Sequence, residues 1–121
     1  MGSDLVNKTH FDANTPSIFT SSNQAASAGS GLTIAHGLGA VPDFVTCELE
    51  CTTAEFNYSI GDIVEYDIFH GRNAGAGVTK DATNLNIRFG ATALQYYNKT
   101  TGAQVTLTDG SWAVRFKAVK Y

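Results

Sequence analysis

The stretch Phe44-Val45-Thr46-Cys47-Glu48-Leu49-Glu50-Cys51 decides the fold class, because its apolar and polar residues alternate with a period of two. Every second residue from Val45 to Cys51 is apolar, and the residues between them are threonine or glutamate. A period of two is typical of a strand that buries one face and exposes the other. The stretch therefore predicts a half-buried β-strand with Glu48 and Glu50 on its outer face.

The same alternation recurs on both sides of this stretch, in short segments that glycine-rich turns separate. No segment of the chain carries the apolar stripe of an amphipathic helix. We therefore expect an all-β fold, an antiparallel β-sandwich of six or seven strands, with a closed barrel as the alternative. Besides 44–51, the segments lie at residues 32–35, 63–69, 84–89, 93–98, 104–108 and 111–119, and two shorter candidates lie at 17–20 and 78–79.

Length and composition indicate one domain that follows a short arm. The 121 residues are enough for a single domain with a core of its own. Residues 1–16 are polar and aperiodic, and we expect a flexible arm or linker there, followed by the sandwich at residues 17–121. Only 16% of the residues are charged, whereas soluble domains average about 25%.

The distribution of charge and hydropathy argues against several partners. The net charge is −3 and the eight lysines and arginines are scattered, so no basic patch is expected to bind nucleic acid. No apolar run approaches the length of a membrane span, and insertion into a membrane is not expected. The amino-terminal residues lack the basic and apolar regions of a signal peptide.

Both cysteines are expected to be buried free thiols. Cys47 and Cys51 are four residues apart on one strand, which places them roughly 13 Å apart. A disulfide needs Cα atoms closer than about 7 Å. Neither cysteine has a partner at metal-ligand spacing, and the three histidines are far apart in the sequence, so no metal and no cofactor is expected.

No residue lies in a sequence motif typical of a catalytic nucleophile, and we predict no catalytic residue. Glu48 and Glu50 are the one pair that could flank a glycosidic bond, since neighbouring residues on one strand face are about 7 Å apart. Exposed charges on strands are far more common than such pairs, and they discourage edge-to-edge aggregation. A carbohydrate-active enzyme is therefore the least favoured of three functional hypotheses.

Several motifs, in this order and spacing, resemble the carboxy-terminal domains of bacteriophage tail-fibre and related virion proteins. They are Leu32-Thr33-Ile34-Ala35-His36-Gly37-Leu38-Gly39-Ala40-Val41-Pro42, Ala54-Glu55-Phe56-Asn57-Tyr58-Ser59-Ile60-Gly61-Asp62, Asp81-Ala82-Thr83-Asn84-Leu85-Asn86-Ile87-Arg88-Phe89-Gly90, Asn98-Lys99-Thr100-Thr101-Gly102 and Trp112. The resemblance covers about residues 20–121. The chain departs from the pattern at Asn57, where glycine is usual, and at its last six residues, which lack a second tryptophan.

The resemblance implies a sandwich similar to H-type lectin domains, a homotrimer at the virion tip, and recognition of a host surface carbohydrate. Asparagine tolerates a positive φ, so the turn at Asn57 is expected to survive. Loops on a rigid sandwich are the usual place for ligand contacts. The residues that we expect to bind ligand are His70, Arg72, Asn73, Tyr58 and Asp62.

Two alternatives remain open on the sequence alone. The chain could instead be a structural virion module, either a decoration protein or a tip that trimerises a fibre, with no ligand of its own. An ion on a threefold axis could also join three copies through His36 or Asp62.

Overall fold

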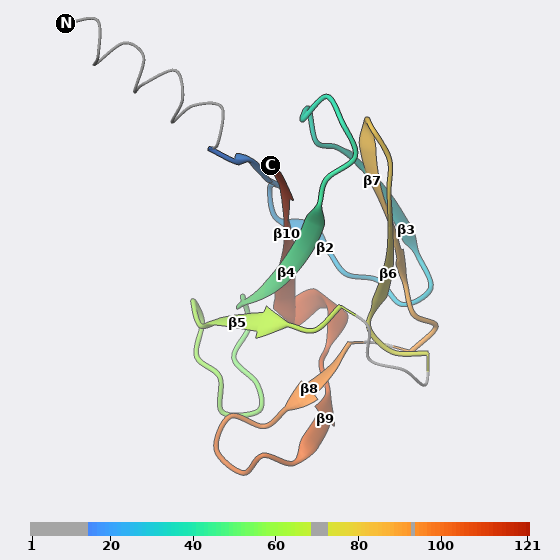
Figure 1. Ribbon diagram of the computed structural model, residues 1–121. Helices are drawn as coiled ribbons and strands as arrows, with labels where there is room; N and C mark the ends of the chain where they lie inside the picture. Colours follow the sequence, from blue (N-terminus) through green and yellow to red (C-terminus); the bar gives the residue numbers. More distant parts are fainter. Residues whose placement is uncertain (1–14, 69–72, 93) are drawn as a thin grey trace, which may run out of the picture.

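The computed structural model describes residues 15–68, 73–92 and 94–121, which form ten β-strands and one short 3-10 helix (Figure 1). All the strand pairs are antiparallel. The strands belong to one five-stranded sheet, one three-stranded sheet and a two-stranded hairpin. The predicted arm lies almost wholly outside the described residues.

The larger sheet is built around the last strand of the chain. Its order is β1-β10-β4-β5, and β2 also pairs with β10. The long β4–β10 pairing runs from Trp112 opposite Cys51 to Val119 opposite Phe44. The strands of this sheet are β1 (Ser17–Thr20), β2 (Gln24–Ala25), β4 (Phe44–Cys51), β5 (Ile63–Tyr66) and β10 (Trp112–Lys120).

The second sheet has the order β3-β7-β6, and the hairpin β8-β9 lies at the opposite end of the molecule from the carboxy-terminal end of β10 (Figure 1). A 3-10 helix, η1 (Asp109–Ser111), joins the hairpin to β10. The strands are β3 (Gly31–Ala35), β6 (Ala76–Lys80), β7 (Asn84–Phe89), β8 (Gln95–Tyr97) and β9 (Gln104–Thr106).

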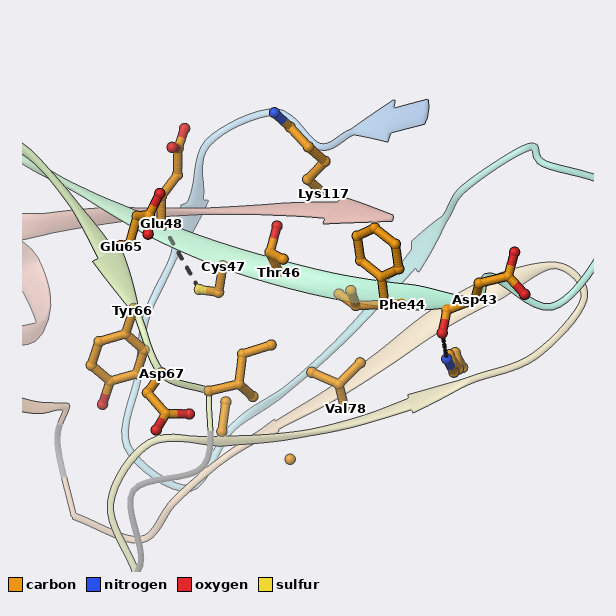
Figure 2. A pocket seen from close by; sticks show the side chains of 15 residues that line it. Asp43, Phe44, Thr46, Cys47, Glu48, Glu65, Tyr66, Asp67, Val78 and Lys117 are labelled. Atoms are coloured by element: carbon orange, nitrogen blue, oxygen red, sulfur yellow. Dashed lines mark hydrogen bonds between the residues drawn. The ribbon is translucent and has the colours of Figure 1, made fainter. Parts of the chain in front are cut away.

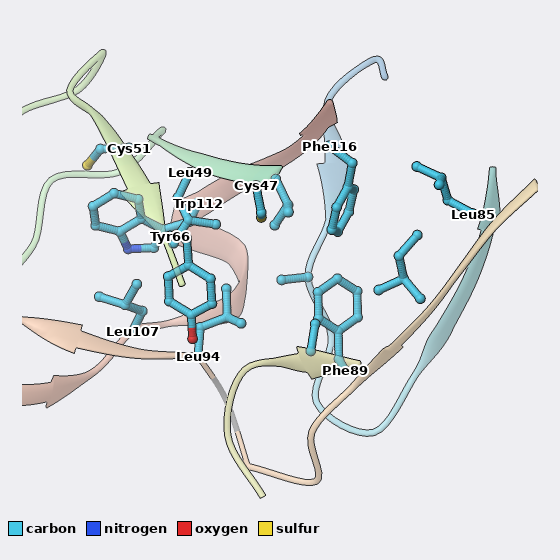
Figure 3. Close-up of a cluster of buried hydrophobic side chains, with 14 of the residues drawn as sticks. Cys47, Leu49, Cys51, Tyr66, Leu85, Phe89, Leu94, Leu107, Trp112 and Phe116 are labelled. Atoms are coloured by element: carbon cyan, nitrogen blue, oxygen red, sulfur yellow. The ribbon is translucent and has the colours of Figure 1, made fainter. Parts of the chain in front are cut away.

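One apolar cluster joins the two sheets, which makes the fold a sandwich. The inward residues of β4 and β10 pack against those of β7, and the cluster continues under the hairpin (Figure 3). Leu49, Phe116 and Leu85 are fully buried. Burial of a large apolar side chain contributes about 1.5–3 kcal/mol to folding, so this cluster is the main source of stability.

The structure confirms the all-β, antiparallel prediction and corrects the number of strands. The predicted bounds of β1, β4 and β7 are those observed. The expected six or seven strands become ten because the short segments at β1 and β6 are also strands, and because β2, with two residues, is too short to show a period of two. The strands β8 and β9 lie within the predicted segments 93–98 and 104–108. β5 ends at Tyr66 instead of Phe69, because the chain turns at Ile68, whose carbonyl accepts a hydrogen bond from Ala76 at 2.7 Å.

Both cysteines are buried free thiols, as predicted. His36 is also buried, and both of its ring nitrogens are engaged. Its Nδ1 accepts a hydrogen bond from the Leu38 amide at 3.0 Å, so Nε2 carries the proton and donates to the Asp81 carbonyl at 2.8 Å. His36 therefore fixes the loop after β3 and offers no nitrogen to an axial ion.

Candidate functional site

The loop at residues 52–62 is held by one half-buried carboxylate. Glu55 Oε1 accepts hydrogen bonds from the Thr108 amide and from Trp112 Nε1, both at 2.8 Å. Phe56 and Asn57 follow with φ values of 52° and 68°, and the Tyr58 amide closes the turn on the Glu55 carbonyl at 2.9 Å. Two consecutive residues with positive φ are the geometry of a type I′ turn, which confirms that asparagine sustains the turn at position 57.

Tyr58 lies beneath this loop and not on its surface. Its side chain is 7% exposed, and its ring meets the Trp112 ring edge-on with centroids 5.2 Å apart. The hydroxyl donates to the Tyr97 carbonyl at 2.7 Å. Burial raises the pKa of Tyr58, so the hydroxyl stays protonated and keeps this hydrogen bond. Tyr58 therefore joins the loop to β8, and its ring is not available to a ligand.

Asp62 is on the surface and is paired with the hairpin. Its carboxylate lies 2.7 Å from Lys99 Nζ and accepts the Ser59 amide at 2.9 Å. The Lys99 hydrogen bond lowers the pKa of Asp62, and the Ser59 amide adds to that effect. The Lys99 ammonium also lies 5.9 Å from the centre of the Tyr58 ring, within the range of a cation–π contact.

Two asparagine side chains join the same loop to the hairpin. Asn57 Nδ2 donates to Asn98 Oδ1 at 3.0 Å. Asn98 Oδ1 also accepts the amides of Thr100 and Thr101 at 2.9 and 3.0 Å, which shapes the turn between β8 and β9. We call the surface formed by Asn57, Asp62, Tyr97, Asn98 and Lys99 the two-loop surface.

The two-loop surface combines a ring with fixed polar groups. Tyr97 is 52% exposed, and its ring packs against Tyr96 with centroids 5.7 Å apart, so its position is set from below. The same loop and hairpin also carry two carboxamides, one carboxylate and one ammonium. Aromatic faces stack on apolar faces of ligands, while amides and carboxylates form directional hydrogen bonds with hydroxyl groups.

Asn73, the third predicted ligand residue that the structure describes, is not part of this surface. Asn73 has a φ of 65°, and its carbonyl accepts the Thr92 amide and hydroxyl at 2.9 and 2.8 Å. His70 and Arg72 lie outside the described residues. Of the three predicted residues that the structure describes, it brings together Tyr58 and Asp62, and Tyr58 serves there as a packing residue.

A groove of about 840 Å³ opens between the two sheets where β5 leaves the edge of β4 (Figure 2). Among the described strands, the first three residues of β4 pair with β10 alone, because the β5 register ends at Cys47. Val45, Tyr66 and Val78 supply apolar lining, and Glu65 and Asp67 supply carboxylates. The volume is in the range of ligand pockets, but Tyr58, Asp62 and Asn73, the predicted ligand residues that the structure describes, do not line the groove.

The thiol in this groove is poorly suited to nucleophilic chemistry. Burial raises the pKa of Cys47 to about 12, and the nearby Glu48 carboxylate adds to the effect. The reactive form of cysteine is the thiolate, which is scarce at neutral pH when the pKa is this high.

The carboxylate pair on β4 is neutralised by one arginine. Arg115, directly opposite Glu48 on β10, places Nε 2.9 Å from Glu48 and Nη1 3.0 Å from Glu50. Both carboxylates share this one cation across the strands. The pair therefore has the arrangement of a cross-strand salt bridge and not of a glycosidase dyad.

Within the described ranges, no three histidine, cysteine, aspartate or glutamate residues lie close enough to hold a metal ion. The described part of the chain also has no helix that is long and apolar enough to cross a membrane. Comparisons with protein-family models, with curated proteins and with solved structures found no match. The functional argument therefore depends on the residues and their geometry.

Proposed function

We propose that this protein is a non-enzymatic receptor-binding domain of a bacteriophage tail fibre or virion tip, acting as a trimer that recognises a host surface glycan. The observation that carries the proposal is the two-loop surface, whose loop and hairpin carry an exposed tyrosine ring, carboxamides and an ion pair. Hydroxyl-rich ligands with one apolar face fit such a surface. The resemblance of the sequence motifs to virion domains similar to H-type lectins supports the same function.

The proposed site lies on a rigid part of the fold. Four hydrogen bonds or ion pairs join the loop at residues 52–62 to the hairpin, and Glu55 anchors that loop to η1 and β10. Preorganised contacts reduce the entropy that binding would otherwise cost. Weak contacts in three copies would then add through effective concentration, which suits attachment to a surface with many identical glycans.

Removing the Tyr97 ring should weaken glycan binding by about tenfold per site, since a ring contact is worth up to about 1.5 kcal/mol. We expect the wild-type chain to bind a subset of a host-derived glycan array. Tyr97→Ala should lose most of that signal, and Tyr97→Phe should keep it because the ring remains. Equal binding by Tyr97→Ala and wild type would place the contact elsewhere, with the groove as the next candidate.

A second function, that of a structural assembly module, is favoured by a different surface. Ile18, Val119 and Phe44 stand in one cross-strand row on the outer face of the larger sheet. Ile18 is 59% exposed and Phe44 43% exposed, and the Phe44 ring lies 6.0 Å from that of Tyr121. We call these four residues the sheet-end patch; Val119 is only 6% exposed, so the exposed apolar surface is that of Ile18, Phe44 and Tyr121. Exposed apolar patches often mark protein–protein contacts.

Both functions involve a trimer, but only the structural module has no ligand of its own. The mass in solution and the binding of glycans are therefore measured together. Light scattering should give the mass of a trimer for the wild-type chain and a lower mass for Phe44→Ser, because an apolar contact is removed at each interface. Ile60→Ser, at an apolar side chain that is 72% exposed on the two-loop side, is the matched control and should remain trimeric. A trimer that binds no glycan on the array would support the structural module. A monomeric wild-type chain would contradict both trimeric models.

A further inference from the structure

The outer face of the three-stranded sheet carries a polar site that the sequence motifs do not point to. Two neighbouring rows cross the strands there: Gly31, Arg88 and Gly77 in one, and Thr33, Asn86 and Thr79 in the next. Residues that are directly opposite in register project to the same face of a sheet. A hollow of about 620 Å³ lies over these two rows.

Arg88 is the cation of this face and has no carboxylate partner among the described residues. Its Nη1 donates to the Gly29 carbonyl at 3.1 Å, which fixes the direction of the side chain. A Cβ at Gly31 would lie 3.1 Å from Arg88 Cζ and Nη2, so the guanidinium rests directly over the glycine backbone. The contact with Gly29 uses one nitrogen, and the remaining donors of the guanidinium fork can face a ligand.

Gly77, on the other side of Arg88, keeps the hollow open. A Cβ there would approach nothing closer than the Arg88 carbonyl at 4.0 Å, so the position is unfilled and not tightly packed. Glycine weakens a strand interior, and one reason for it there is the close approach of a ligand or another backbone. Because neither Gly31 nor Gly77 has a side chain, a ligand can reach Arg88 from the outer face of the sheet.

The second row supplies uncharged hydrogen-bonding side chains next to Arg88. Thr33 Oγ1 and Asn86 Oδ1 are 3.3 Å apart, and Asn86 Nδ2 lies 3.3 Å from Asp81. Thr79 is two residues from Gly77 and thus diagonal to Arg88, a separation of about 7–8 Å between Cα atoms. Its hydroxyl makes no hydrogen bond within the part of the chain that the structure describes.

We propose that this sheet face is a second binding site, for a saccharide that carries a carboxylate, in which Arg88 pairs with the carboxylate. Arginine recognises carboxylates through two parallel hydrogen bonds, and threonine and asparagine bind the neighbouring hydroxyls. A bare phosphate or sulfate would bind Arg88 but would make no use of the hydroxyl and carboxamide groups in the second row. The site is distinct from the two-loop surface, and it does not depend on the function proposed for that surface.

Amide shifts in ¹H–¹⁵N NMR spectra of the full chain would test the proposal with 3′-sialyllactose and lactose as matched probes. We expect sialyllactose to shift the amides of Gly77, Thr79 and Asn86 and to bind at least tenfold more tightly than lactose. Added salt should weaken the binding, because the pair is exposed. Glucuronate and its methyl ester repeat the comparison with the charge alone removed.

Two variants separate the site from the fold. Arg88→Gln removes the charge, and Gly77→Thr fills the hollow while leaving Arg88 in place; both should reduce the affinity by about tenfold or more. Lys117→Gln, which removes an exposed cation of the other sheet, is the control and should bind as the wild type does. Unchanged affinity in both test variants, equal binding of charged and neutral probes, or no shift with either acidic probe at millimolar concentration would overturn the proposal. If Tyr97→Ala loses binding on the glycan array while the amide shifts of Gly77, Thr79 and Asn86 persist, the lost binding belongs to the two-loop surface and not to this site.

Discussion

Replacing Phe116 with alanine should lower the free energy of unfolding by about 3–5 kcal/mol, the cost of removing a buried aromatic side chain. Phe116 is 0% exposed and lies in the middle of β10, the strand that pairs with β1, β2 and β4. Its ring sits where the two sheets meet, close to Cys47 and facing β7 (Figure 3). The cavity left by alanine would open between the sheets, where the surrounding strands cannot close it.

Denaturant unfolding monitored by circular dichroism measures this loss, and Phe44→Ala is the matched control. Phe44 is on the outer face and 43% exposed, so the same substitution should cost much less there. If the sheet-end patch joins copies of the chain, the Phe44→Ala effect will depend on protein concentration, whereas the Phe116→Ala effect on each chain will remain large at every concentration. Equal losses for the two variants would contradict the assignment of Phe116 to the core.

Gly90→Ala should destabilise the protein by about 3 kcal/mol or more, because the new methyl group collides with backbone and not with a movable side chain. A Cβ at Gly90 would lie 2.1 Å from the Asn73 carbonyl oxygen and 2.6 Å from the Asn73 carbonyl carbon. The Gly90 amide and carbonyl are also fixed, by Gly75 at 2.9 Å and Gly29 at 2.7 Å. The chain therefore cannot shift without losing these hydrogen bonds.

Thermal unfolding would show a melting temperature lowered by about 10 °C or more for Gly90→Ala. Gly110→Ala is the control, since a Cβ there meets nothing within 4 Å and its φ is not positive. That substitution should leave stability unchanged or raise it slightly, through reduced entropy of the unfolded chain. A melting temperature for Gly90→Ala close to that of Gly110→Ala would mean that Asn73 does not lie against Gly90.

Most of the strands could be predicted because apolar and polar residues alternate along them. The inward residues of β10, from Trp112 to Ala118, and those of β7 follow a period of two without interruption. The two-residue strand β2 could not be predicted, because its pairing depends on a neighbour that is distant in sequence. β2 is a strand only because Gln24 and Ala25 lie opposite Val114 and Ala113.

The site was harder to predict for the same reason. Tyr58 looks like an accessible aromatic residue of a loop until its hydroxyl is placed on the Tyr97 carbonyl, 39 residues away. The Asp62–Lys99 pair spans 37 residues. In sequence, Arg88 is simply an outward residue of a strand. Its two glycine neighbours come from β3 and β6, and only the sheet register places them on either side of it.

The pairing of β1 with β10 also determines how the domain would carry a pulling force. Ser17 lies opposite Lys120, so the described chain enters and leaves at the same end, and the two-loop surface is at the other end (Figure 1). A cell held at that surface would load β1 along its own length against β10. Hydrogen bonds stressed in this direction share the load and must break together, whereas bonds at an unzipping end break one by one. If the proposed function holds, a particle attached through this domain would therefore resist flow at the β1–β10 pair, at the end away from the two-loop surface.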